Sequence, residues 1–239
     1  MIESARRQLR QRLGSPGVWI SLAVLAVLSG FSIGNGQPAS FLTTLAVFVI
    51  AGGIVSRDAA SGALQLILTR PILRGEYLFG RFLGALVLLA GFVTAALGIT
   101  YSMDRVASLA GWSSGGPLMD WGAAAAATLH DFLAGTLSVA IVLLFSTFLR
   151  GIGDVLAYIL CGLGLNLLPQ LFDTMRKPSL AAGARTLLEN VAPNVAWMEI
   201  AHGDRFLQAP TGRYFLAVAV YLLAAALIFN RREFSYGAD

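Results

Sequence analysis

The chain has 239 residues, of which 56% are hydrophobic and only 13% are charged, and its mean hydropathy is +0.72. Soluble domains carry about 25% charged residues, so this composition excludes a protein whose main solvent is water. Several apolar runs approach the roughly 20 residues that a helix needs to cross a hydrocarbon core about 30 Å thick, which favours continuous helices over the strands of a barrel. We therefore predict an all-α integral membrane protein with one domain over residues 1–239.

Residues 1–15 combine four arginines with apolar residues at helical spacing. This pattern is typical of a helix in the membrane interface, but a basic flank that orients the first span fits equally well. Both interpretations put the N-terminus in the cytoplasm. No small-x-small cleavage pattern follows Ile33, so we expect the first apolar segment to be retained.

Six apolar segments follow along the chain, and we predict spans at residues 18–33, 41–55, 82–101, 126–149, 155–171 and 214–229. With the N-terminus inside, the inner segments hold 11 of the 17 lysines and arginines. Because basic residues concentrate on the cytoplasmic side, this count supports two cytoplasmic termini and a place in the inner (plasma) membrane. Cys161, the single cysteine, lies inside an apolar run and predicts a buried, inert thiol.

The outer segment 172–213 is too long for a simple turn. Its residues 180–191 have a helical apolar pattern, which Pro193 interrupts. Residues 195–201 then fit a re-entrant or interfacial helix, and an ordinary external loop remains the alternative.

Small residues form a stripe on the third span, at Gly80, Gly84, Gly91, Ala95 and Gly98. They fall on one face at 100° per residue, so another helix should approach closely there. We expect a neighbour from the same chain, with a second copy as the alternative.

Between the second and third spans lies a cytoplasmic segment, residues 56–81. It begins with Asp58 and small residues, continues through an apolar turn, and stops at Arg70 and Pro71, where proline disfavours further helix. A second helix begins near Arg74. The apolar turn fits a rigid knob for a soluble partner, and an amphipathic connector lying on lipid fits it too.

This segment resembles the cytoplasmic signature of ABC-2-type transporter permeases. The matching residues are Gly62, Leu64, Leu66, Leu68, Pro71, Arg74, Glu76 and Gly80. The sequence departs from the family pattern with Asp58 for the usual glutamate, Ala63 for threonine and Arg81 for lysine. The shorter carboxylate of Asp58 leaves its pairing open.

The resemblance implies the permease subunit of an ATP-binding-cassette exporter, in which a coupling helix inserts into a separate ATPase subunit. It also implies that two permeases, identical or related, pair around the substrate path. Residues 62–68 would be the docking element, and the full set that it implies for docking is Asp58, Gly62, Leu64, Gln65, Ile67, Leu68, Arg70, Pro71, Arg74 and Glu76.

The sequence carries no ATPase motif. A Walker A loop needs a lysine followed by Ser or Thr, but Lys177, the only lysine, is followed by Pro178. We therefore expect ATP and Mg²⁺ on the partner ATPase, and no cofactor on this chain. Two histidines and one cysteine predict no metal cluster, and nothing indicates a nucleic-acid partner.

Three polar residues inside the predicted spans are candidates for function. His130 and Asp131 form the one ionisable pair there, which indicates a role in the substrate path or a proton relay, unless their helix begins lower and leaves the pair at the surface. Asn166 is a further candidate for the substrate path, although it fits a hydrogen bond between helices better than a ligand contact.

Two other functions stay open. An integral-membrane hydrolase would use His130 and Asp131 as an acid–base pair, although the serines of residues 112–116 lie in a predicted outer loop and not in a nucleophile elbow. A membrane anchor without transport activity is the third. The sequence does not identify a substrate, because nearly every helix in the chain is apolar.

Overall fold

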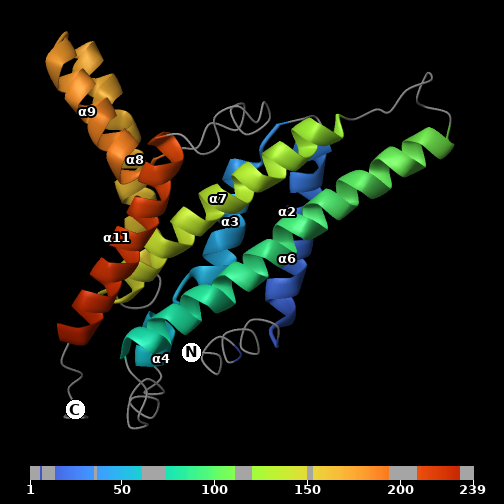
Figure 1. Ribbon diagram of the computed structural model, residues 1–239, viewed down its shortest axis with the longest axis horizontal. Coiled ribbons are helices and arrows are strands. Elements are labelled where there is room, and N and C mark those ends of the chain that lie inside the picture. Colours follow the sequence, from blue (N-terminus) through green and yellow to red (C-terminus); the bar gives the residue numbers. More distant parts are fainter. Residues whose placement is uncertain are drawn as a thin grey trace.

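The computed structural model describes residues 6, 14–34, 37–60, 74–110, 120–149, 153–193 and 209–231. All regular structure in these ranges is helical, as predicted (Figure 1). The helices are α2 (Pro16–Gly34), α3 (Ser40–Ala51), α4 (Ser56–Ala60), α6 (Arg74–Leu109), α7 (Trp121–Ser146), α8 (Gly153–Thr174), α9 (Pro178–Val191) and α11 (Ala209–Arg231).

In the described ranges, six helical segments are long and apolar enough to cross a membrane. They are Pro16–Gly34, Ser40–Asp58, Arg74–Leu109, Trp121–Phe148, Gly153–Thr174 and Gly212–Arg231, and each contains or overlaps one predicted span. The prediction of an all-α membrane protein with six spans is confirmed. Of the predicted N-terminal helix, residues 1–15, only Arg6, Gly14 and Ser15 are described, and residues 195–201 lie outside the described ranges.

The two ends of the bundle differ. The end that carries α4, the start of α6 and the last turn of α11 is called the α4 end here, and the opposite one is the far end (Figure 1). The third span is longer than predicted, because no helix breaker follows Arg74 and α6 continues for 36 residues, or about 54 Å. At its far end the ring of Tyr101 lies 5.5 Å from that of Trp121 in α7.

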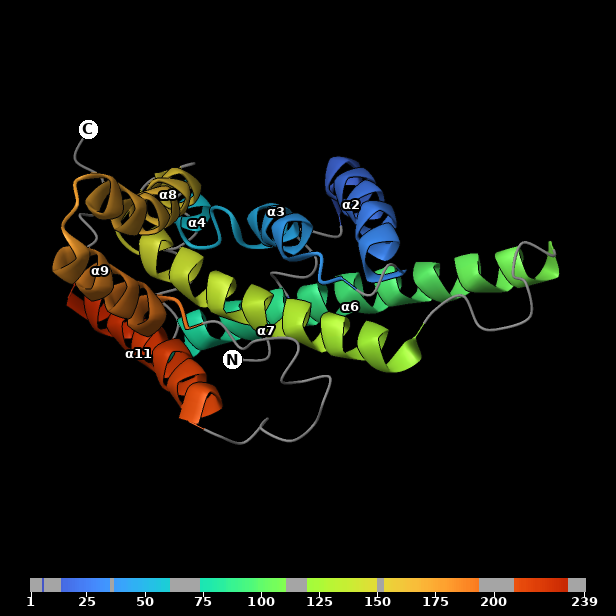
Figure 2. The same ribbon diagram turned by 90° about the horizontal axis from the view of Figure 1, so that it is seen from above.

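The core lies between α3, α6 and α7. Val47 and Ile50 of α3, Leu89 of α6 and Leu143 of α7 are all fully buried. Of the six spans, α7 is the most buried and α8 the least. In Figure 2, α8, α9 and α11 lie on one side of the bundle, and α2 lies on the other against α6. The most buried spans are therefore those of α3 and α7, and α8 lies at the periphery.

Only part of the predicted glycine stripe on α6 packs within this chain. Gly80 and Gly84 are buried, whereas Gly91 and Gly98 are exposed, with no described atom within 4 Å of a Cβ placed on either. Among the described residues, no neighbour therefore packs against the far half of the stripe. The reason is that α2 crosses α6 on another face, where Gly30 lies against Ala96 and the Thr100 hydroxyl donates to the Gly30 carbonyl at 2.8 Å.

Helices α8 and α9 form a hairpin beside α11. The helix predicted within residues 180–191 is present as α9, and the exposed pair Arg185 and Asp173 links it to α8. The Tyr221 hydroxyl of α11 donates to the carbonyl of Val191 at the end of α9. Cys161 of α8 is exposed on the chain, so the prediction of a buried thiol is wrong, because no other described helix covers that face.

Candidate functional site

The predicted docking segment is described only at its two ends. Asp58 belongs to α4, and Arg74 and Glu76 belong to the first turn of α6. The remaining docking residues, Gly62, Leu64, Gln65, Ile67, Leu68, Arg70 and Pro71, lie outside the described ranges. What the structure provides is thus the anchoring of this segment on both sides.

A buried polar cluster joins α4 to α6. Tyr77 and Arg81 lie one turn apart and so share one face of α6. The Tyr77 hydroxyl donates to Asp58 Oδ2 at 2.6 Å, and the Arg81 guanidinium donates to the same oxygen. Arg81 Nε also donates to the Tyr77 hydroxyl at 3.3 Å. Asp58 is 4% exposed and Arg81 0% exposed, so this is a fully desolvated ion pair that needs its partners.

The cluster explains two departures from the family pattern together. Asp58 is shorter than the usual glutamate, and Arg81 is longer than the usual lysine, and these two side chains are partners. The guanidinium also lies 5.4 Å from the centre of the Tyr77 ring, a cation–π contact that a compact ammonium makes less well. The pairing of Asp58, which the sequence left open, is therefore with Arg81.

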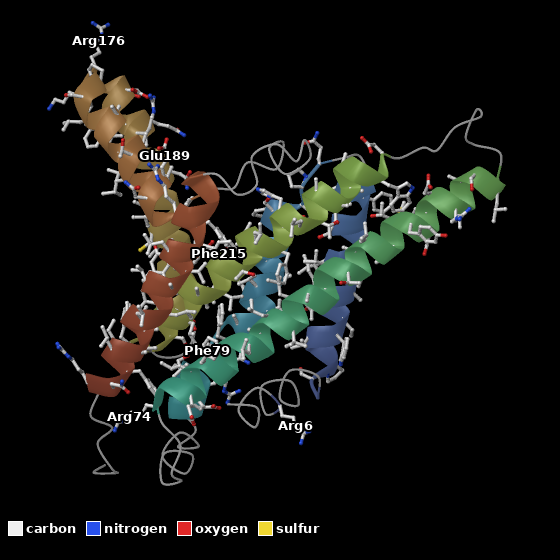
Figure 3. All side chains as sticks on the ribbon, in the orientation of Figure 1. Arg6, Arg74, Phe79, Arg176, Glu189 and Phe215 are labelled. Carbon is white, nitrogen blue, oxygen red and sulfur yellow. The ribbon has the colours of Figure 1, made fainter. Side chains whose placement is uncertain are left out.

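The end of α11 closes on the same cluster. The ring of Phe229 stacks on that of Tyr77 with 5.9 Å between centroids. Arg74 donates to the carbonyl of Asn230 at 3.0 Å, where the last turn of α11 leaves carbonyls without helical partners. Glu76, in contrast, is exposed. The first turn of α6 thus connects the start of the docking segment to the last span, and Figure 3 shows Arg74 at this end of the bundle.

A tight turn, residues 52–55, leads from α3 into α4, and two side chains hold its backbone. Gly53 has φ +70°, a left-handed conformation that favours glycine. Its N–H donates to Asp154 Oδ2 at 2.7 Å. The N–H groups of Val55 and Ser56 both donate to the hydroxyl of Ser146, at 3.0 and 3.1 Å. Amides that water would satisfy in a soluble protein are satisfied here by the end of α7 and the start of α8.

Sequence reasoning missed Ser146 and Asp154. Asp154 was visible as an acidic residue in the first turn of a helix, and it is 0% exposed. Its second oxygen accepts from the N–H of Val155 at 2.9 Å. An acidic residue in the first turn of a helix predicts that it caps that helix. No sequence pattern identifies its other partner, the N–H of Gly53, which is 101 residues away.

His130 and Asp131 lie on α7 and are buried near the far end. Asp120 caps α7, so the helix begins at Trp121 and the pair lies about 13 to 15 Å along it. The alternative in which the helix starts lower is therefore wrong. Asp131 Oδ2 accepts from the N–H of Ala39 at 2.8 Å, and its Oδ1 accepts from the hydroxyl of Ser40 at 3.2 Å. Asp131 thus satisfies donors at the start of α3, and a role in the substrate path stays a prediction.

Asn166 does not make the expected hydrogen bond to another helix in the described structure. Its side chain is exposed on α8 and donates to the carbonyl of Gly162, one turn earlier in the same helix, at 2.8 Å. The reason is the exposure of α8, since no described helix lies within reach of this face. Among the described residues, no group of three or more His, Cys, Asp or Glu side chains could hold a metal ion.

Six apolar helices around a buried centre, with desolvated ionic and polar groups satisfied inside the bundle, define a multi-pass α-helical membrane protein. The family model of the ABC-2 family transporter proteins matches residues 20–234, nearly the whole chain, and the chain belongs to this family. The resemblance drawn from residues 56–81 is thereby confirmed. The family is one of membrane permeases of ABC transporters, and it implies association with an ABC ATPase. No curated protein sequence matches the chain significantly.

Proposed function

We propose that this chain is the substrate-path subunit of an ABC exporter and that it has no enzymatic activity of its own. A separate ATPase, which binds ATP and Mg²⁺, docks on residues 62–68 at the α4 end. The observation that carries this proposal is the buried Asp58–Arg81 pair. The pair joins α4 to α6 just outside the docking segment. A movement of that segment would therefore be transmitted to the second and third spans.

The distribution of charge supports a cytoplasmic α4 end. Arg6 and Arg74 lie at this end, whereas Arg176 lies at the tip of the α8–α9 hairpin (Figure 3). Together with the sequence count, in which 11 of 17 basic residues fall on the same side, this supports both termini in the cytoplasm of a cell with an inner (plasma) membrane.

A second permease, either another copy or a related chain, completes the substrate path. In support of this, α8 exposes a face that includes Leu160, Leu163 and Leu167, and the far half of the α6 stripe is open. Lipid covers what the second permease leaves exposed. His130, Asp131 and Asn166 remain the candidate polar residues of the path.

The hydrolase alternative is weakened by the hydrogen bonds of Asp131. Both of its carboxylate oxygens already accept from the start of α3, and His130 Nδ1 lies 3.7 Å from Asp131 Oδ1, outside hydrogen-bond distance. In a catalytic triad the carboxylate orients the imidazole, and this one bonds to the start of α3 instead.

The test is co-purification with an ATPase. The chain is co-expressed with each ABC ATPase of the source organism, solubilised in mild detergent and isolated through a tag on the ATPase. Leu64→Asp and Ile67→Asp should abolish recovery of the permease, because a carboxylate cannot be buried in an apolar docking pocket. Leu180→Asp, on the exposed surface of α9, is the matched control and should leave recovery unchanged. Full recovery of both docking variants would overturn the proposal.

A further inference from the structure

Helix α8 meets α3 through its first two turns, where the hydroxyl of Tyr158 also lies 2.9 Å from that of Ser138 in α7. Beside the Gly53–Asp154 hydrogen bond, a methyl group of Val155 lies against Gly52, where an added Cβ would approach it to 3.1 Å. One turn later the ring of Tyr158 meets that of Phe48 edge-on, with 5.3 Å between centroids. Helix α8 therefore contacts the bundle where residues 52–55 lead into the docking segment.

Beyond these turns α8 has few buried residues among the described residues of the single chain. Of its 22 residues only Asp154 and Pro169 are buried. The described helices that it packs against are α7 and α9, and α9 is itself mostly exposed. Helix α7, in contrast, contributes 14 buried residues. A force applied at residues 52–55 will consequently displace α8 more easily than α7.

The two side chains that hold the turn belong to these two unequal helices. Ser146 is the last residue of the firmly packed α7 and accepts from Val55 and Ser56. Asp154 belongs to the loosely packed α8 and accepts from Gly53. The turn thus has a fixed contact on one side and a movable contact on the other. A tilt of roughly 10° at the base of α8, a helix about 33 Å long, moves its other end by about 6 Å.

We propose that Asp154 is a positioning residue that links the turn at residues 52–55 to α8, so that α8 is the span that moves relative to α7 when the ATPase acts on the docking segment. The inference rests on the proposed function, since it assigns the path of a movement that the ATPase starts. Ser146 serves as the pivot in this arrangement.

The single cysteine of the chain provides the reporter. Cys161 is exposed on α8, beyond the attached turns, so a nitroxide label there needs no cysteine removal. The full chain with its ATPase is reconstituted in phosphatidylcholine–phosphatidylglycerol vesicles. The electron paramagnetic resonance spectrum is recorded without nucleotide and with ATP and vanadate. The expected result is a nucleotide-dependent change in label mobility at Cys161.

Two controls separate movement of α8 from a general effect. A label on α7, introduced by Leu129→Cys in a Cys161→Ser background, should respond less than the label at Cys161, because α7 is the fixed element. Equal responses of the two labels would overturn the inference. Absence of ATPase binding by the unmodified chain would instead refute the proposed function, and binding without a response at Cys161 would refute only the present inference.

The role of Asp154 is tested in the Cys161-labelled chain. Asp154→Ala removes the acceptor for Gly53 and should reduce or abolish the nucleotide-dependent spectral response. ATPase co-purification should be unchanged. Asp154→Asn keeps one acceptor oxygen and should retain part of the response. If the alanine variant does not fold, the asparagine variant alone tests the role of Asp154, and a normal response in it would count against that role. Asp173→Ala, at the other end of α8, should respond normally, and a normal response in both Asp154 variants would overturn the assignment.

Discussion

Arg81 and Asp58 form an ion pair in which both side chains are almost completely shielded from solvent. They come from two helices that the docking segment separates, and Tyr77 bonds to both of them. A pair of this kind makes the position of the docking segment depend on the third span.

Removing one member of this pair should destabilise the fold more than removing both. Arg81→Met alone leaves a buried carboxylate uncompensated and should cost about 3–5 kcal/mol of the free energy of unfolding. Adding Asp58→Asn to it should recover part of this loss. The measurement is a double-mutant cycle from thermal unfolding in detergent micelles. Exposed partners make the matched control: Asp173→Asn with Arg185→Met should change the stability by less than about 1 kcal/mol. Additive losses at Asp58 and Arg81 would show that the two side chains do not interact.

Gly53 should not tolerate a side chain. With φ at +70°, alanine there meets the left-handed penalty of about 1–2 kcal/mol. Its Cβ would also come within 2.8 Å of Arg57 Nε. Gly75→Ala is the control, because no described atom lies within 4 Å of a Cβ at that helical position, and it should be neutral or stabilising. Equal unfolding temperatures for the two variants would contradict this reading of the turn.

Asp131 should stabilise the start of α3. Asp131→Ala removes the acceptor for the buried N–H of Ala39 and should cost about 1–3 kcal/mol, the range for a buried donor left without a partner. Asp131→Asn, which keeps one acceptor, should cost less. Unfolding curves of the three proteins test the order. If the asparagine variant is as stable as the parent chain but no longer supports transport, Asp131 belongs to the substrate path as well.

The contact between α2 and α6 should depend on Gly30. A Cβ at this position would lie 3.0 Å from Ile99 and 3.1 Å from the Ala96 carbonyl. Gly30→Val should therefore destabilise the chain by about 1–3 kcal/mol through overpacking. Gly98→Val, on the open face of α6, should leave the stability of the single chain nearly unchanged. The comparison is made by thermal unfolding of detergent-solubilised monomer, and a larger loss for the Gly98 variant would show that its face is covered.

The sequence allowed the spans to be predicted well, because the length of an apolar run is a local property of the sequence. A run of 18 or more apolar residues is typical of a transmembrane helix. It could not show which side chains meet. Asp58 and Arg81 stand 23 residues apart, with no periodic pattern between them. Exposure was predicted least well: Cys161 and Asn166 lie in a run as apolar as any buried helix, so hydropathy cannot distinguish a face toward protein from a face toward lipid.

The short length of α3 has a consequence for the surrounding bilayer. With 12 residues, α3 is about 18 Å long, well below the hydrocarbon thickness of about 30 Å. Alone in lipid it would force the membrane to thin, but α2, α6 and α7 pack around it. The thickness of lipid that this protein matches is therefore determined by the longer spans around α3, because the second span, Ser40–Asp58, is completed by a turn and α4.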